Sequence, residues 1–306
     1  MEQDTVIEYW EKSKLLEGAK DKKKLAHLLE NQKLFNASAS INEKIKINFN
    51  LFKTITIPLI ARLCNEFVLF DLINFDVLTR PAQNVSYRES KTNMTKEFEL
   101  AAKTRWLKTR WKQDRLNELY DNELTKSEAE AKFFLEFYDS IYDEMEMEII
   151  GDLSRNVGAQ SEVEWKNIAT LLDNILIRSR SIEKTSGRSA EWVIIPTEIY
   201  NEIKNLQEFV KLEEFDPKSS KIQKLGKLFN NLYVYICPQL PDLEILIGNL
   251  NYGYCYYPFI LFGGIVEANP TYPDNYGLFF RYGKKLVDNS NYSKITISGY
   301  SFKKEV

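Results

Sequence analysis

A long amphipathic segment from Thr125 to Gly151 constrains the fold of this chain more than any other stretch. Thr125 followed by Glu128 is the pattern of a capping box, in which the hydroxyl accepts from an orphan amide and the carboxylate reaches back. Apolar residues then recur at the spacing of one helical face, at Phe134, Phe137, Tyr138, Ile141, Tyr142, Met145 and Ile149. Gly151 supplies a left-handed residue at which such a helix can end. A helix of roughly 39 Å follows from 1.5 Å per residue, and it needs a sheet or other helices along its length.

The face opposite this apolar stripe is acidic. Its charged residues are Glu130, Glu136, Asp139, Asp143, Glu144, Glu146 and Glu148, with Lys132 as the one base among them. A carboxylate cluster could bind a metal ion or supply a general acid and base. However, no histidine or cysteine is interleaved, and the acids spread around the arc that the apolar stripe leaves uncovered. We therefore interpret this face as a solvated or partner-facing surface.

The composition is that of a soluble globular protein, with 44% apolar and 28% charged residues in 306 positions. This length allows one large domain or two modest ones. The formal net charge of −3 argues against the chain as a whole being a nucleic-acid binder. The 17 Tyr and 18 Phe residues are many for such a chain and suit extensive burial, including burial between subunits.

The sequence lacks the residues of common active sites. Its single histidine, His27, excludes most hydrolytic triads and the common zinc and haem sites. It contains no glycine-rich dinucleotide or phosphate loop and no nucleophile elbow. Cys64, Cys237 and Cys255 are far apart among apolar neighbours, which indicates buried free thiols. We expect no catalytic residue, no cofactor and no metal, and therefore no enzyme.

No targeting or membrane segment is expected. The acidic start lacks a hydrophobic core segment, so no signal peptide is predicted. The longest apolar run, residues 252–266, is broken by Pro258, Gly263 and Gly264 and falls short of the roughly 18 residues that a bilayer span needs. We expect assembly in the cytoplasm, without a membrane partner.

The N-terminal 50 residues predict an arm that cannot fold alone. Residues 4–34 show helical periodicity with an interruption at Gly18, and neither half has enough apolar surface for a core. Residues 36–50 are a polar connector. The arm must therefore lie on another surface.

A basic tandem repeat follows a strand at residues 83–90 and a tip at residues 91–98. It reads Lys103-Thr104-Arg105-Trp106, Leu107, Lys108-Thr109-Arg110-Trp111. Tryptophans among basic residues could stack on single-stranded nucleic acid. The two tryptophans are five residues apart, however, so on a strand they project to opposite faces. We favour a basic amphipathic strand that docks on an acidic protein surface.

The second half of the chain mixes helices and strands. We expect helices at residues 161–183 (ended by Gly187) and 197–212, and a linker with turns at residues 218–231. Period-2 or fully apolar runs predict strands at residues 192–196, 232–236, 244–248, 254–261, 278–284 and 294–300. The expected fold class is α+β.

Four stretches in this order resemble a known family. They are Tyr9-Trp10 to Gly18 with residues 29–32; residues 57–60 through Phe70-Asp71 to the strand at 83–87; the basic return into residues 115–120 and the long helix ending at residues 154–158; and residues 192–196 with 226–227, 233–235, 256–260 and 279–283. Together they resemble the major capsid proteins of tailed bacteriophages, in particular a short relative of the T-even-phage major capsid protein, with the Hong Kong 97-type fold. Leu28-Leu29-Glu30 also resembles a processing-site pattern of that family.

The resemblance implies a division of the chain. An N-terminal arm (1–50) precedes the first part of a peripheral domain (51–78) and an extended loop (79–112). The peripheral domain continues with the long spine helix (113–151), an axial domain follows (152–265), and residues 266–306 supply closing strands of the peripheral domain. The large insertions of the T-even proteins are absent.

The resemblance also implies a function. The chain would assemble into hexamers and pentamers of an icosahedral virion capsid that encloses double-stranded DNA by non-specific contact, with portal, scaffolding and other head proteins as partners. From the charge pattern we expect an intersubunit contact through Arg105, Trp106, Arg110, Trp111, Asp143 and Glu144. Two alternatives remain open: an encapsulin-like protein nanocompartment shell, and a nucleic-acid-binding module that uses the tryptophan tandem.

Overall fold

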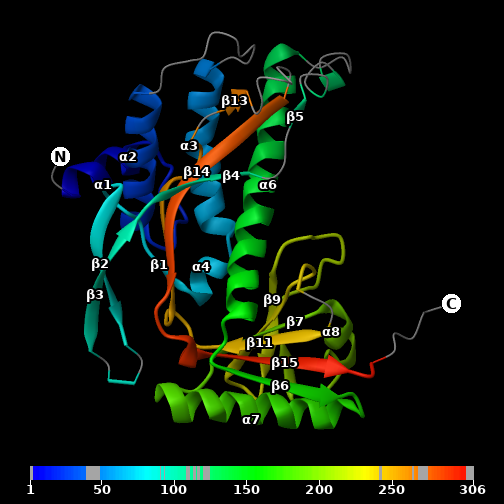
Figure 1. Ribbon diagram of the computed structural model, residues 1–306. Helices are drawn as coiled ribbons and strands as arrows, with labels where there is room; N and C mark the ends of the chain where they lie inside the picture. The colour runs from blue at the N-terminus through cyan, green and yellow to red at the C-terminus, as the bar shows by residue number, and fades with distance from the viewer. Residues whose placement is uncertain are drawn as a thin grey trace.

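The structure, a computed structural model, describes residues 3–38, 49–89, 91–92, 94–107, 111–112, 115, 118–119, 125–240, 243–263, 265–267 and 275–300 (Figure 1). Its helices are α1 (Gln3–Lys12), α2 (Lys22–Ser38), α3 (Phe49–Glu66), α4 (Leu69–Leu72), α6 (Lys126–Arg155), α7 (Ile168–Ser186) and α8 (Thr197–Ile203). Its strands are β1 (Asn74–Phe75), β2 (Ala82–Arg88), β3 (Thr95–Ala101), β4 (Lys103–Trp106), β5 (Trp111–Lys112), β6 (Ala159–Glu164), β7 (Trp192–Ile195), β8 (Phe209–Lys211), β9 (Gln223–Leu228), β10 (Leu232–Ile236), β11 (Glu244–Gly248), β12 (Tyr254–Ile260), β13 (Ile265–Glu267), β14 (Asn275–Leu286) and β15 (Tyr292–Ser298). The expected α+β class is confirmed.

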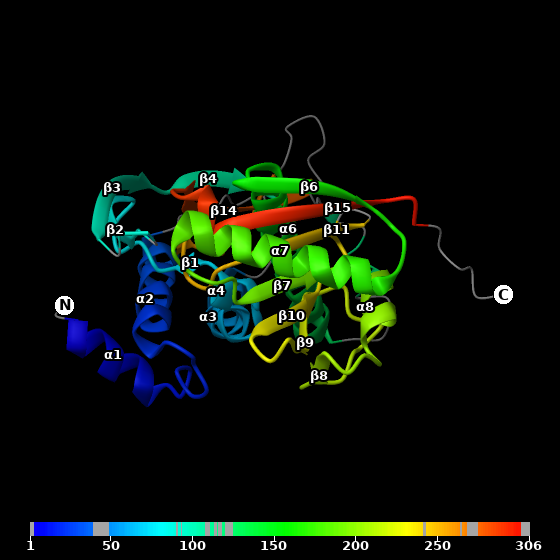
Figure 2. The same cartoon turned by 90° about the horizontal axis from the view of Figure 1, so that it is seen from below.

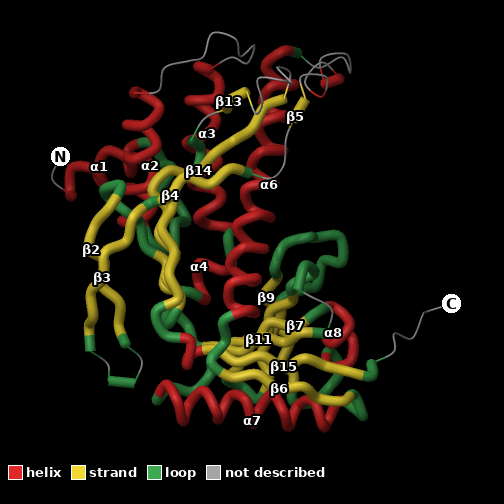
Figure 3. The backbone as a smooth tube through the Cα atoms, viewed as in Figure 1, coloured by secondary structure: helices red, strands yellow, loops and turns green. Residues whose placement is uncertain are grey.

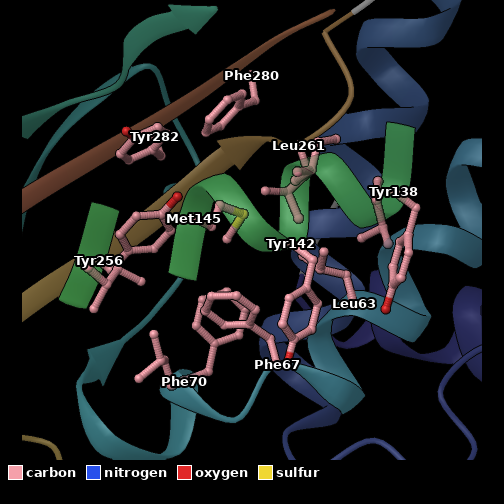
Figure 4. Packing of buried hydrophobic residues seen from close by; sticks show 14 of the residues in the cluster. Leu63, Phe67, Phe70, Tyr138, Tyr142, Met145, Tyr256, Leu261, Phe280 and Tyr282 are labelled. Carbon is pink, nitrogen blue, oxygen red and sulfur yellow. The ribbon is translucent and has the colours of Figure 1, made fainter. Parts of the chain in front are cut away.

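The spine of the molecule is α6, which runs from the upper helices down to the lower sheet in Figure 1. Its capping box is confirmed, because the Thr125 hydroxyl accepts from the Glu128 amide and the Glu128 carboxylate accepts from the Thr125 amide. The predicted apolar stripe is buried along its whole length. Figure 4 shows its tyrosines and Met145 packed against residues of α3, α4, β12 and β14.

The predicted end of this helix at Gly151 is wrong, since α6 continues for one more turn to Arg155. Tertiary contacts in that turn outweigh the helix-breaking tendency of glycine. Leu153 is 1% exposed, and the Ser154 hydroxyl donates to Glu244 at 2.5 Å. Asn156 then ends the helix in a conformation that is not left-handed.

A seven-stranded sheet lies below α6, in the order β6-β15-β11-β7-β10-β9-β8, with α7 across one face (Figure 2). Strand β7 is buried on both sides, as its unbroken apolar run predicts. Gly248 on β11 is required by close packing, because a Cβ there would lie 2.3 Å from the Trp192 ring. This sheet and α7 enclose the second of two large apolar clusters.

A second sheet lies beside the upper part of α6. Its order is β1-β12-β14-β13, with β4 and β5 also paired to β14. The antiparallel β12–β14 pair brings Tyr256 and Tyr282 into stacked contact at 4.7 Å between ring centroids. Together with α2, α3, α4 and α6 it encloses the first apolar cluster.

The N-terminal arm packs on the chain's own subunit, and the described part belongs to its core. Leu28 and Leu29 of α2 are 0% exposed. The Gln32 side chain donates to the Phe262 carbonyl at 2.6 Å and accepts from the Phe262 amide at 3.1 Å. Trp10 of α1 donates to the buried Glu30 carboxylate at 3.2 Å. The surface on which residues 3–38 of the arm pack therefore belongs to the same chain.

The loop expected at residues 79–112 is shorter in the structure. Strands β2 and β3 form a hairpin that is not hydrogen-bonded into either sheet (Figure 3), although its Val85 and Leu100 pack on Tyr257 of β12 in a small apolar cluster. Residues 103–106 and 111–112 instead join β14. The part of the expected loop that lies outside the two sheets is thus limited to residues 82–101, because residues 103–106 and 111–112 pair with β14 in the second sheet.

Several other expectations need correction. Residues 161–164, expected to begin a helix, belong to β6 (Ala159–Glu164), which pairs with β15, and α7 begins only at Ile168. Residues 223–228 form β9 within the expected linker. The expected grouping of residues 266–306 as strands of one unit does not match the strand pairing. Strand β14 lies in the second sheet, whereas β15 lies between β6 and β11 because Ile295 and Ile297 fill the cluster under α7.

Candidate assembly surface

A groove of about 650 Å³ runs between α6 and the strands β4 and β14. Four of the six residues predicted for an intersubunit contact line it, namely Arg105, Trp106, Asp143 and Glu144. The groove therefore brings the basic strand and the acidic helix face together within one chain.

The strand pairing of β4 positions the basic side of the groove. Trp106 pairs with Phe279 of β14, and their ring centroids are 5.3 Å apart. Half of the Trp106 surface remains exposed, and Met147 on the facing helix is 55% exposed. Arg105 lies with its guanidinium carbon 5.9 Å from the centroid of the Tyr282 ring. Two large apolar side chains thus border a charged groove and stay in contact with solvent.

The other two predicted residues are not shown at this groove. Arg110 lies outside the described residues. The backbone of Trp111 pairs with Tyr276 of β14, so its strand belongs to the same sheet as β4.

The interpretation of the acidic helix face as solvated is wrong for Glu130 and Glu146, which are each 1% exposed. Glu136 forms an ion pair with Arg115 at 2.6 Å, and Asp139 lies 3.4 Å from Lys221. Desolvation, with help from Asp139, raises the pKa of Asp143. The helical periodicity showed which residues share the acidic face of α6. The segments that cover part of this face are distant in sequence.

An ion-pair network that the sequence did not reveal forms the floor of the groove. The Lys284 ammonium lies 2.6 Å from Glu148 and 2.5 Å from Asp152. The Tyr254 hydroxyl donates to Asp152 at 2.7 Å, and Tyr282 donates to Glu148. Although burial opposes ionisation, the hydrogen bonds from Lys284 and Tyr254 lower the pKa of Asp152 below its ordinary value. The alternation of β14, with Tyr282 and Lys284 two residues apart, was the one sequence signal for this face.

The described residues contain no group of three or more histidine, cysteine, aspartate or glutamate side chains placed to hold a metal ion. Within the same residues, none of the helices combines the length and apolarity of a membrane span.

No protein-family model matches the chain, and no curated protein matches its sequence. Among solved structures, the chain is similar to the virus-like particle from Pyrococcus furiosus, at 11% identity over 89% of this chain and 98% of that chain, with a TM-score of 0.46. It is also similar to the capsid of the cyanophage P-SCSP1u, at 8% identity over 76% of this chain and 89% of that chain, with a TM-score of 0.49. A third similar structure is the holo-SrpI encapsulin complex from Synechococcus elongatus, at 12% identity over 76% of this chain and 89% of that chain, with a TM-score of 0.42. These scores and identities are too low to assign a function.

Proposed function

We propose that this chain is a capsid shell protein with the Hong Kong 97-type fold, specifically a major capsid protein of a tailed bacteriophage. The proposal is carried by the way in which the long helix, the two sheets, the hairpin and the N-terminal arm are arranged. One 30-residue helix joins two sheets, a two-stranded hairpin is hydrogen-bonded into neither, and an N-terminal arm lies on the second sheet (Figure 1). This is the set of parts that the order of the sequence motifs implies.

The exposed surfaces support a role in assembly rather than in catalysis. The hairpin β2–β3 packs on β12 through one small apolar cluster, and Met94 near its tip is 62% exposed. Trp106 and Met147 border the groove along α6. Large exposed apolar side chains beside charged groups are typical of protein interfaces. A closed, repeated interface would bury such side chains in every subunit.

The predicted intersubunit contact is refined by this geometry. Arg105, Trp106, Asp143 and Glu144 lie on one surface, so Arg105 of one subunit need not reach the carboxylates of the next. Instead, we propose that these residues form one receiving surface for the hairpin tip of a neighbouring subunit. In this arrangement Met94 is the apolar anchor, next to Lys91, which is exposed.

The remaining parts of the proposal concern the particle. Hexamers and pentamers would form an icosahedral head in the host cytoplasm, with portal, scaffolding and other head proteins. The formal charge of −3 suits a container that holds double-stranded DNA by non-specific contact, because a strongly cationic wall would bind the phosphates tightly.

Electron microscopy of the purified chain, with any scaffold or portal that it needs, tests the proposal. Closed shells filled with double-stranded DNA would support the phage head. Shells filled with an enzyme cargo would favour an encapsulin-like compartment. Strong, salt-dependent binding of single-stranded nucleic acid by the monomer, without rings or shells, would favour a nucleic-acid-binding module.

A further inference from the structure

A short segment at the entrance to β9 is held from two sides. The amide of Ile222 donates to Oε1 of Glu146 on α6 at 2.9 Å. The Ser220 carbonyl accepts from Nε2 of Gln239, in the loop after β10, at 3.4 Å. Glu146 thus attaches residues 220–222, which lead into the seven-stranded sheet, to the spine helix, and Gln239 attaches them to the loop after β10.

The second carboxylate oxygen of Glu146 and the amide oxygen of Gln239 both lack a hydrogen-bond donor within the described residues. Oε2 of Glu146 and Oε1 of Gln239 are both buried, and neither has a hydrogen-bond partner anywhere in the described parts of the chain. Glu146 and Gln239 line one cavity of about 200 Å³, together with Cys237 and Ile150. A carboxylate oxygen and an amide oxygen are both acceptors, so they can be joined only if a proton or a water supplies the donor.

The charged neighbours of Glu146 do not compensate a negative charge there. Asp143 lies one turn earlier on the same helix. Lys221 is drawn toward Asp139 at 3.4 Å and lies over the Tyr142 ring at 4.4 Å. Arg155, at the edge of the cavity, pairs with Asp152 at 2.9 Å.

Burial is the main cause that raises the pKa of Glu146 to about 8, and Asp143 adds to it. The Ile222 amide and Lys221 act in the opposite direction without cancelling the effect. This direction agrees with the arrangement of acceptors in the cavity.

We propose that Glu146 carries a proton and donates it to Gln239, directly or through a water in the cavity, so that the pair forms a pH-sensitive latch between the spine helix and the seven-stranded sheet. The latch is a property of the folded subunit and is independent of the proposed function.

The sign of the pH dependence follows from linkage. When the segment opens, Glu146 reaches solvent and regains its ordinary pKa. Between that value and about 8, the closed state holds a proton that the open state releases. The latch is therefore strongest in mild acid, weakens as the pH rises toward about 8, and changes no further above it.

Hydrogen exchange of the peptide that contains Ile222, followed by mass spectrometry from pH 5.5 to 7.5, tests the latch in the full chain. Glu146→Gln keeps an acceptor for the Ile222 amide, supplies a permanent donor to Gln239 and removes the titration. The ratio of exchange rates between the wild-type chain and Glu146→Gln cancels the intrinsic pH dependence of exchange. We expect this ratio to rise with pH, by up to about tenfold per unit.

Glu136→Gln is the matched control, because it removes one negative charge from the same helix and its ion-pair partner, Arg115, lies outside residues 220–222. It should keep the wild-type pH dependence. A ratio of wild type to Glu146→Gln that stays constant with pH, or a Glu136→Gln variant that loses the dependence equally, would overturn the proposal.

A second measurement covers the case in which Glu146→Gln does not fold. Infrared spectra of the wild-type chain should show the carbonyl stretch of a protonated buried carboxyl at pH 7, and this band should shift in Gln239→Leu because its hydrogen-bond acceptor is removed. Absence of the band at pH 7, or a band that Gln239→Leu leaves unchanged, would contradict the latch.

Discussion

Trp106 and Trp192 show how two tryptophans of one chain can have different roles. Trp192 is 0% exposed and donates to the Asn249 carbonyl at 3.0 Å, so it belongs to the interior of the subunit. Trp106 is half exposed and touches Phe279 on one side only. Since half of its surface is left uncovered by its own chain, Trp106 is the better candidate for an anchor between subunits.

Removal of Trp106 and Trp111 should therefore affect assembly more than folding. We expect Trp106→Ala combined with Trp111→Ala to lower the free energy of unfolding by about 1 kcal/mol, within the ordinary range of single substitutions. The yield of shells should fall sharply, because truncation of an interface anchor costs about 2 kcal/mol or more at every repeated contact. Thermal melting of the monomer and electron microscopy of the shells measure the two effects.

Trp192→Ala is the matched control and should cost about 3–5 kcal/mol in the subunit itself. An unfolded double variant of Trp106 and Trp111 would show that these tryptophans belong to the core, and the placement of the assembly surface would then be wrong.

At the scale of elements, the arm is the part whose role the structure changes most. Helix α2 places Leu28 and Leu29 in the main apolar cluster and Glu30 in contact with Trp10. The residues that resemble a processing site are thus buried in the folded subunit. A protease would reach them only before α2 docks or when it opens.

Substitutions in α2 measure how much the arm stabilises the subunit. We expect Leu29→Ala to lower the free energy of unfolding by about 2–5 kcal/mol, as truncation of a fully buried leucine does. Leu34→Ala in the same helix should change it by less than about 0.5 kcal/mol, because Leu34 is 59% exposed. Urea unfolding of both variants gives the comparison, and equal small effects would mean that α2 is not docked.

The sequence predicted those elements whose pattern is set by local spacing. The capping box at Thr125 and the buried stripe of α6 follow from helical periodicity, and β7 follows from its unbroken apolar run. Contacts between distant segments were not predictable in this way. Nothing near Gly151 in sequence signals that Glu244 bonds to Ser154 and so extends the helix, and nothing near Glu146 signals that Ile222 covers it.

The same limit applies to the candidate site. Arg105, Trp106, Asp143 and Glu144 line one groove, but the sequence could not show that pairing of β4 with β14 places them together on one subunit. The proposed contact between subunits consequently involves the tip of the β2–β3 hairpin instead of the basic tandem repeat at residues 103–111.

At the scale of the whole molecule, the proposed shell should respond to salt. Lys91 of the incoming hairpin and the carboxylates along the groove are accessible enough for ions to screen them. At about 1 M salt the screening length falls to roughly 3 Å, so these attractions weaken. We expect shells to lose subunits in 1 M sodium chloride that they retain in 0.1 M, as measured by sedimentation. Equal stability at both concentrations would mean that apolar contacts such as Met94 dominate the interface.

The central claim, that this chain builds a shell, is tested most directly by electron microscopy of the purified protein at high concentration, with any scaffold or portal that it needs. The account predicts closed particles of hexamers and pentamers in which the hairpin β2–β3 of each subunit lies along α6 of its neighbour. A protein that stays monomeric under all these conditions, or particles in which the groove along α6 faces solvent and touches no neighbour, would contradict it.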